Sequence, residues 1–181
     1  MDMTFDAHEV FEIAQRIEAN GVRFYQKAAQ QPGSVSARMM LLELAKMEDK
    51  HLRTFARMRE SLPPGGMPPS AINADTEAAA YLRVLADSRV FGGADSPAGS
   101  SPTAGVSPSR QLTGQESVEQ ILRAAILLEK ESISFYVGLV ELVPPELGKS
   151  NITEIIREEM RHMVTLMAEL ERQTPATAAM G

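Results

Sequence analysis

Glutamate and histidine residues recur at a fixed spacing in this sequence. A Glu-x-x-His motif occurs twice, and a single glutamate precedes each copy at the same distance along the chain. Carboxylate oxygens with one imidazole for each metal are a ligand set that suits iron or manganese, and zinc is an alternative. The spacing therefore predicts a two-metal carboxylate site. Its six predicted ligands are Glu18, Glu48, His51, Glu129, Glu159 and His162.

The residues around the two single glutamates are repeated as well. Residues 17–25 and 128–136 both have a glutamate in second place and end in Phe-Tyr. The offset between these two segments equals the offset between Glu48 and Glu159, and that between His51 and His162. Two unrelated helical hairpins would not be expected to share this register by chance. We interpret the repeat as two copies of one helix pair, each carrying half of the site.

Four long segments have apolar residues at helical spacing, and strand-like alternation is absent. Prolines and glycines separate these segments. The sequence therefore predicts an all-α fold, a four-helix bundle made of two helical hairpins. The predicted helices cover about residues 6–30, 36–61, 115–143 and 151–172. Thr4 or Asp6 is expected to cap the first helix, and Thr113 with Glu116 is expected to form a capping box on the third.

A length of 181 residues suits one domain with a sizeable core. We expect hairpin one at 6–61, a crossover at 62–114, hairpin two at 115–172 and a short tail at 173–181. The crossover is expected to hold a short amphipathic helix over about 75–90, followed by a Gly-, Ser- and Pro-rich flexible loop. A connection this long suits a chain that must travel the length of the bundle.

In each predicted hairpin, the turn falls midway between the two glutamates. The midpoints are Gly33 and Pro144. Each glutamate is then about fifteen residues, roughly 22 Å, from its turn, so both lie at one height. The glutamate and histidine of each motif are one helical turn apart and share one helix face. Apolar residues flank all four glutamates on their own faces, which predicts that the site is buried.

Four carboxylates on apolar helix faces would be costly to bury without partners. Such groups must be protonated or neutralised by cations. Two divalent metals carry the four positive charges that four ionised glutamates balance, and two neutral imidazoles complete the set. The alternative is that these glutamates lie exposed on their helices and that the histidines find ordinary hydrogen-bond partners.

Composition excludes several classes of function. A net charge of −6 without a basic stripe argues against a nucleic-acid partner. No apolar run is long enough to span a membrane, and the N-terminus lacks the features of a signal peptide. The absence of cysteine excludes disulfides, iron–sulfur clusters and thiolate zinc sites. We therefore expect a cytoplasmic protein that binds neither membranes nor nucleic acids.

On these motifs, the chain resembles the rubrerythrin and bacterioferritin branch of the ferritin-like superfamily, over residues 6–61 and 115–172. The resemblance implies a single ferritin-like domain with two Fe ions, or Mn or Zn in their place. It implies that Glu18 and Glu129 are terminal or bridging ligands. It also implies that Glu48 and Glu159 bridge or flank the metals, while each histidine binds one metal.

The resemblance further implies a role for Tyr25 and Tyr136, as catalytic residues that hydrogen-bond the opposing carboxylates. The alternative for both tyrosines is core packing with a satisfied hydroxyl.

Three departures from the family pattern limit the resemblance. Rubrerythrin peroxidases carry an additional glutamate where this chain has Ser132, and Glu131 lies about 200° around the helix from Glu129. The chain lacks the cysteines of a rubredoxin-like domain, so electrons must come from an external donor protein or from Fe(II) itself. Asp49 and Lys50 stand where bacterioferritin has its haem-binding methionine, so no haem is expected.

The resemblance favours an oxidoreductase whose Fe(II) pair reacts with H2O2 or O2, of the peroxidase or ferroxidase type. Two alternatives stay open: an iron-binding, sensing or storage protein without turnover, and a bundle whose metal pair is purely structural. We expect a homodimer, in which the long crossover permits helix exchange.

Overall fold

The computed structural model describes residues 7–31, 33–63, 77–87 and 112–173. These residues form helices and connecting turns, so the predicted all-α fold is confirmed. The expected caps at Thr4 and Asp6, residues 91–111 of the loop predicted over 91–114 and most of the tail lie outside the described residues.

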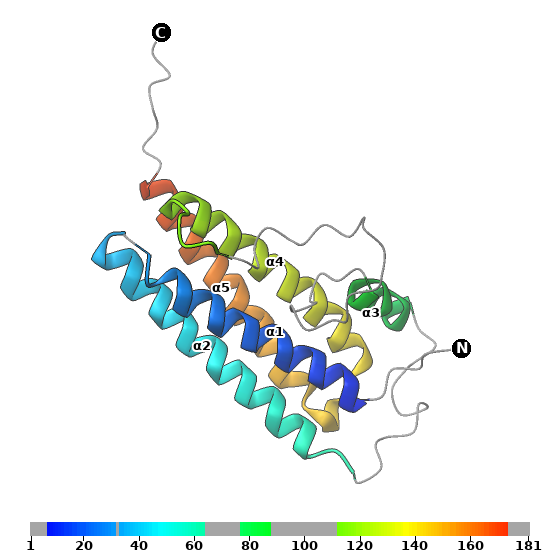
Figure 1. The fold of residues 1–181 in the computed structure, drawn as a ribbon. Coiled ribbons are helices and arrows are strands. Elements are labelled where there is room, and N and C mark those ends of the chain that lie inside the picture. The colour runs from blue at the N-terminus through cyan, green and yellow to red at the C-terminus, as the bar shows by residue number, and fades with distance from the viewer. Residues whose placement is uncertain (1–6, 32, 64–76, 88–111, 174–181) are drawn as a thin grey trace.

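Four long helices form the bundle in two antiparallel pairs (Figure 1). The first pair is α1 (Ala7–Ala28) and α2 (Val35–Glu60), and the second is α4 (Val118–Leu142) and α5 (Lys149–Gln173). The shorter α3 (Glu77–Asp87) packs against α4. A 3-10 turn, η3 (Pro145–Leu147), joins α4 to α5. This is the predicted arrangement of two hairpins, with a short helix in the connection between them.

The start of α4 corrects the sequence prediction. The capping box is made by Ser117 and Gln120, not by Thr113 and Glu116, so the helix begins at Val118 rather than at residue 115. The Glu116 carboxylate instead accepts hydrogen bonds from the backbone N–H groups of Thr113 and Gly114, at 2.5 and 2.9 Å. Gly114 has a φ of 96°, which turns the chain before the helix and which residues with a side chain rarely adopt.

The second helix of each pair also has a defined start. The side chain of Ser34 caps α2 by accepting a hydrogen bond from the backbone N–H of Ala37, at 3.0 Å. Helix α5 begins at Lys149, slightly before the predicted start, because η3 and Gly148 complete the turn within a short stretch of chain. Gly148 has a φ of 92°, the left-handed conformation that favours glycine.

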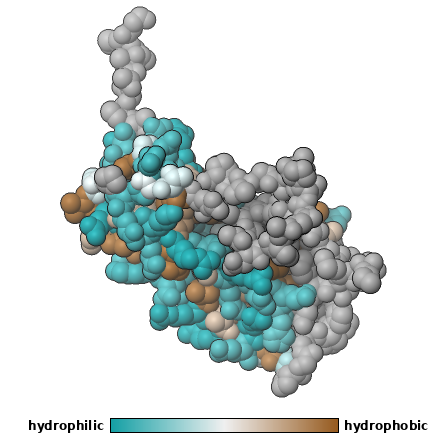
Figure 2. Space-filling model, in the orientation of Figure 1, coloured by the Kyte–Doolittle hydropathy of each residue, from teal (hydrophilic) through white to brown (hydrophobic). Residues whose placement is uncertain are grey.

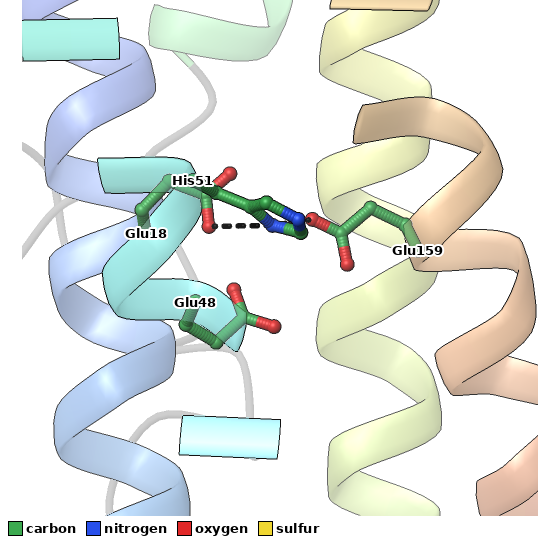
Figure 3. A group of neighbouring side chains, drawn as sticks. All are labelled: Glu18, Glu48, His51 and Glu159. Atoms are coloured by element: carbon green, nitrogen blue, oxygen red, sulfur yellow. Dashed lines mark ion pairs between the residues drawn. The ribbon is translucent and has the colours of Figure 1, made fainter. Parts of the chain in front are cut away.

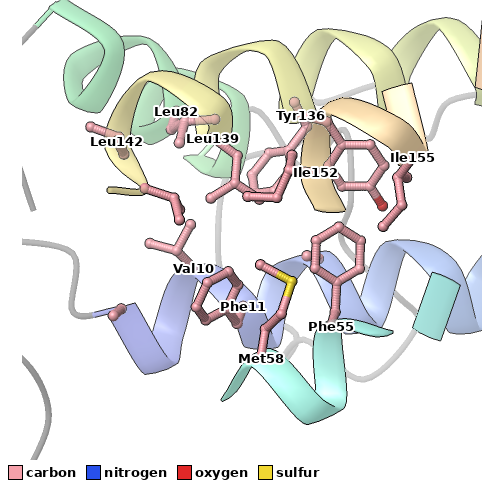
Figure 4. Close-up of a cluster of buried hydrophobic side chains, with 14 of the residues drawn as sticks. Val10, Phe11, Phe55, Met58, Leu82, Tyr136, Leu139, Leu142, Ile152 and Ile155 are labelled. Atoms are coloured by element: carbon pink, nitrogen blue, oxygen red, sulfur yellow. The ribbon is translucent and has the colours of Figure 1, made fainter. Parts of the chain in front are cut away.

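The core consists of two apolar clusters, one toward each end of the bundle. One contains Phe11 of α1, Phe55 of α2, Leu139 of α4 and Ile152 of α5 (Figure 4). The other includes Phe24, Leu44, Leu122 and Leu166 from the same four helices. Burial of each such side chain contributes about 1.5–3 kcal/mol. The four predicted glutamate ligands lie between the two clusters along their helices.

The outer surface carries mostly polar side chains. Figure 2 shows a largely hydrophilic face over the described residues, with apolar side chains scattered on it. None of the helices in the described part of the chain combines the length and apolar character needed to cross a membrane.

Candidate metal centre

The six predicted ligands meet at mid-height in the bundle, and all six side chains are buried. Two overlapping groups of four have ligand atoms that lie within 4.8 Å of one another. The first group is Glu18, Glu48, His51 and Glu159, and the second is Glu48, Glu129, Glu159 and His162. Each long helix contributes one glutamate, and α2 and α5 also contribute one histidine each. The structure therefore brings together every residue of the predicted ligand set.

Two of the glutamates, Glu48 and Glu159, are common to both groups. Glu159 directs one oxygen to each histidine. Its Oε1 lies 3.1 Å from Nδ1 of His51, and its Oε2 lies 2.8 Å from Nδ1 of His162. Glu18 and Glu129 each belong to one group. This is the arrangement expected for two cations that share two carboxylates.

Both histidines present the same ring nitrogen to the centre. Nδ1 of His51 lies 3.7 Å from Oε2 of Glu18, and Figure 3 shows the ring between the carboxylates of Glu18 and Glu159. Nδ1 of His162 lies 3.4 Å from Glu48 and 3.6 Å from Glu129. The two rings are stacked, with centroids 5.8 Å apart. Each Nδ1 is thus placed to act as a ligand atom.

The donor atoms at the centre fit a pair of cations. Several of them are buried without a hydrogen-bond partner among the described residues: Oε2 of Glu18, Oε1 of Glu48, both oxygens of Glu159 and Nδ1 of both histidines. Some of these atoms approach one another within ion-pair distance but without hydrogen-bond alignment. Burying carboxylate oxygens and ring nitrogens without a partner costs free energy unless a cation or a proton satisfies them.

Without a metal, protons must perform this neutralising role. Burial raises the pKa of Glu18 and Glu48, and it raises the pKa of Glu129 to about 8. Burial alone would lower the pKa of the histidines, but the neighbouring carboxylates outweigh it. They raise the pKa of His51 to about 11 and that of His162 to about 12. A bound metal must displace these protons.

A tyrosine from each hairpin hydrogen-bonds a glutamate of the other hairpin. The hydroxyl of Tyr25 on α1 donates to Glu129 on α4, and the hydroxyl of Tyr136 on α4 donates to Glu18 on α1. Burial, together with these carboxylates, raises the pKa of both tyrosines well above its ordinary value. The sequence left two alternatives for these tyrosines, hydrogen bonds to the opposing carboxylates or core packing. The structure shows the hydrogen bonds. A catalytic role for the tyrosines stays a prediction.

One carboxylate beside the centre is not among the residues predicted from the sequence. Glu158 on α5 lies 2.6 Å from Nε2 of His51, on the side of the ring opposite its ligand atom. The ammonium of Lys50 donates to the same carboxylate, at 2.9 and 3.2 Å. Burial opposes ionisation of Glu158, but His51 and Lys50 outweigh it and lower its pKa. Its position directly before Glu159 was the available sequence signal.

Gly21 was also missed. A Cβ built on this residue would lie 2.9 Å from Oε2 of Glu48, which is closer than real contacts allow. The absence of a side chain at Gly21 therefore lets the shared carboxylate lie against α1. In the repeat, Gly21 occupies the position in α1 that Ser132 occupies in α4.

A small cavity of about 20 Å³ opens beside the centre, between α1 and α4. Its lining includes Gly21, Ser132, Glu48 and Glu129. Glu131 lines it too, although its helical angle from Glu129 argued against a role at the centre. This volume is enough for about one water-sized molecule.

Comparison with known proteins supports the fold. No protein-family model matches this chain, and no curated protein matches it. Among solved structures, a ferritin-like diiron-carboxylate protein from Thermotoga maritima matches with a TM-score of 0.62 and 19% sequence identity. The match covers 96% of this chain and 100% of that one. With its two helical hairpins and its buried Glu/His centre, this chain has the ferritin-like fold.

Proposed function

We propose that this protein is a di-iron carboxylate oxidoreductase that oxidises Fe(II) with H2O2 or O2. The observation that carries the proposal is the buried set of six donors, in which two glutamates are shared between two groups of four. Four ionised glutamates and two neutral imidazoles balance two divalent cations. The name of the Thermotoga maritima protein, a diiron-carboxylate protein, supports iron as the metal.

Two bound Fe(II) ions would supply one electron each, and reduction of one H2O2 to two waters takes these two electrons with two protons. The residues of this chain would hold and surround that pair. Glu48 and Glu159 would bind between the two positions, and each histidine would bind one position. Tyr25 and Tyr136 would orient Glu129 and Glu18 and keep their own hydroxyl protons, because burial raises the pKa of both phenols.

The cavity supports a small oxidant as the second reactant. It reaches Glu48 and Glu129, and its volume of about 20 Å³ suits a molecule close to the size of water. The short side chain of Ser132 leaves this space open. The apolar clusters above and below the centre exclude bulk solvent from the other directions.

The electrons for repeated turnover would come from a separate protein or from Fe(II) itself. The chain has no cysteine with which to build an iron–sulfur centre of its own. The homodimer expected from the sequence stays a prediction.

An anaerobic titration of metal-stripped protein with Fe(II) tests the proposal. We expect two irons per chain, followed by rapid oxidation when H2O2 or O2 is added, recorded by stopped-flow absorbance. The Glu18→Ala variant should lose most of this rate. Glu43→Ala is the matched control, because Glu43 is an exposed glutamate of the same bundle that pairs with Lys46.

Other results select the alternatives. Two irons that oxidise no faster than in Glu18→Ala would indicate binding, sensing or storage without turnover. Equal stabilisation by Zn(II) and Fe(II), with no oxidation, would indicate a structural metal pair. One iron or none per chain would overturn the proposal.

A further inference from the structure

The two halves of the repeat that places the six donors differ at the position directly before each Glu-x-x-His motif. Glu158 directly precedes Glu159, whereas Met47 directly precedes Glu48 at the corresponding position of the first half. We propose that the two metal positions are inequivalent: the metal at His51 is held tightly, and the metal at His162 is held weakly and exchanges. This inference rests on the metal pair of the proposed function, and it concerns affinity and exchange, not turnover.

A hydrogen bond at Nε2, the ring nitrogen that faces away from the centre, orients the ring of His51. A carboxylate only accepts hydrogen bonds, so Nε2 of His51 donates its proton to Glu158 across 2.6 Å. Nδ1 is therefore the nitrogen that gives up its proton when a metal binds, and it faces Glu18 and Glu159. The ammonium of Lys50 donates a hydrogen bond to Oε1 of Glu158, at 2.9 Å. A carboxylate that accepts from a ligating histidine orients the ring and raises its basicity, and loss of such a partner commonly costs about 10- to 100-fold in metal affinity.

The ring of His162 has no such support. Its side chain is 3% exposed, and Nε2 has no hydrogen-bond partner among the described residues. Met47, at the position that corresponds to Glu158, is partly buried against the apolar cluster that contains Leu44 and Leu166. A thioether cannot replace a carboxylate as a strong acceptor. The ring of His162 therefore lacks the hydrogen bond that orients the ring of His51, and its Nδ1 is the weaker ligand.

The cavity is a second difference between the two metal positions, and it also favours weaker binding at the His162 position. Of the six donors, it touches Glu48 and Glu129. Both belong to the group that contains His162, and Glu129 belongs to that group alone. The cavity does not touch Glu18 or His51. A metal at the His162 position is thus the one next to the opening between α1 and α4, and it is the one that leaves first.

Co(II) binding to the metal-stripped full chain tests this inference without any redox reaction. We expect two binding steps, followed by calorimetry and visible absorbance, whose dissociation constants differ by at least tenfold. Release to EDTA should likewise show one fast and one slow phase of equal amplitude. The His162→Ala variant should lose the weak step and the fast phase, whereas His51→Ala should lose the tight step.

Two further variants test the physical cause. Glu158→Gln should weaken the tight step by about 10- to 100-fold and bring it close to the weak one. Met47→Glu, which restores the repeat, should strengthen the weak step by at least threefold. Glu154→Gln is the control, because Glu154 is an exposed glutamate on the same helix that pairs with Arg157. It should leave both steps unchanged. Thermal unfolding identifies any variant that fails to fold.

The outcomes separate this inference from the proposed function. Two equal steps in the unaltered chain, or loss of the tight step in His162→Ala, would overturn the inference and leave the oxidoreductase standing. Two unequal steps assigned as predicted, without Fe(II) oxidation, would overturn the oxidoreductase alone. A chain that binds no metal would overturn both.

Discussion

The hydrogen bond from Tyr136 occupies one oxygen of Glu18 and leaves the other oxygen for the centre. Tyr136 donates to Oε1 of Glu18, while Oε2 of the same carboxylate faces Nδ1 of His51. The pair therefore fixes the orientation of Glu18 from the opposite hairpin. A buried acceptor that loses its donor costs about 1–3 kcal/mol.

The Tyr136→Phe variant tests this contact in the metal-stripped protein. We expect its free energy of unfolding to fall by about 1–3 kcal/mol, because the Glu18 oxygen stays buried without its donor. Urea denaturation measures the loss. The control is Tyr81→Phe, since Tyr81 is 42% exposed on α3 and its change should stay within about 0.5 kcal/mol. Equal stability of the two variants would contradict an important bond between Tyr136 and Glu18.

At the scale of elements, α1 carries a glycine at the point where the Glu48 side chain of α2 lies against it. Gly21 lies in the interior of α1, where alanine would stabilise the helix by about 1 kcal/mol relative to glycine. A side chain here would crowd the centre, because a Cβ on this residue would lie 2.9 Å from Oε2 of Glu48. At this residue, helix propensity favours alanine, whereas the space needed by the Glu48 carboxylate favours glycine.

The Gly21→Ala variant separates these two effects. The unfolding temperature of the metal-stripped protein should be unchanged or slightly higher, because the helix gains and the flexible Glu48 side chain moves aside. Affinity for Co(II) should fall at least tenfold, since Glu48 is shared by both metal positions. Thermal unfolding and calorimetry measure the two quantities. Gly33→Ala is the comparison, because among the described residues a Cβ there would meet Val118, at 3.2 Å, and none of the six donors. Unchanged affinity in Gly21→Ala would contradict the role assigned to this glycine.

For the whole molecule, the centre is where the two hairpins are joined. The helices within each hairpin contact each other more extensively than the hairpins do. The ligand contacts and the tyrosine bonds run from one hairpin to the other across a buried acidic layer. Metal bound there would neutralise the layer and connect the hairpins, so metal binding and folding are linked.

This linkage has a defined dependence on pH. The pKa values of His51 and His162 are raised to about 11 and about 12, and those of Glu18, Glu48 and Glu129 are raised as well. Between pH 6.5 and 9 the folded, metal-free chain thus holds more protons than the unfolded chain. Its stability should fall as pH rises through this range.

Metal should reverse this trend. Metal competes with the same protons, so Co(II) should stabilise the protein more at pH 9 than at pH 6.5, and its binding should release protons. A free Co(II) concentration of about 100 times the dissociation constant should add about 2.7 kcal/mol. Urea denaturation at the two pH values, with and without Co(II), measures both effects. Stabilisation that does not depend on pH would contradict the displacement of protons.

The sequence alone determined the helices, the pairing of hairpins and the set of six residues that meet. These follow from local periodicity and from equal spacing on either side of Gly33 and Pro144, which place the glutamates at one height. The start of α4 was less well determined. Thr113 with Glu116 and Ser117 with Gln120 both have residue types that suit a capping box, and the fold selects the second pair.

The tertiary structure decided everything that depends on how the helices are rotated against one another. The bond from His51 to Glu158 joins residues far apart in the chain, and the approach of Glu48 to Gly21 sets the wall of a cavity. Helical periodicity identifies the buried face of each helix but not which side chains of two distant helices meet. Packing of the whole bundle sets those contacts, and with them the difference between the two halves of the centre.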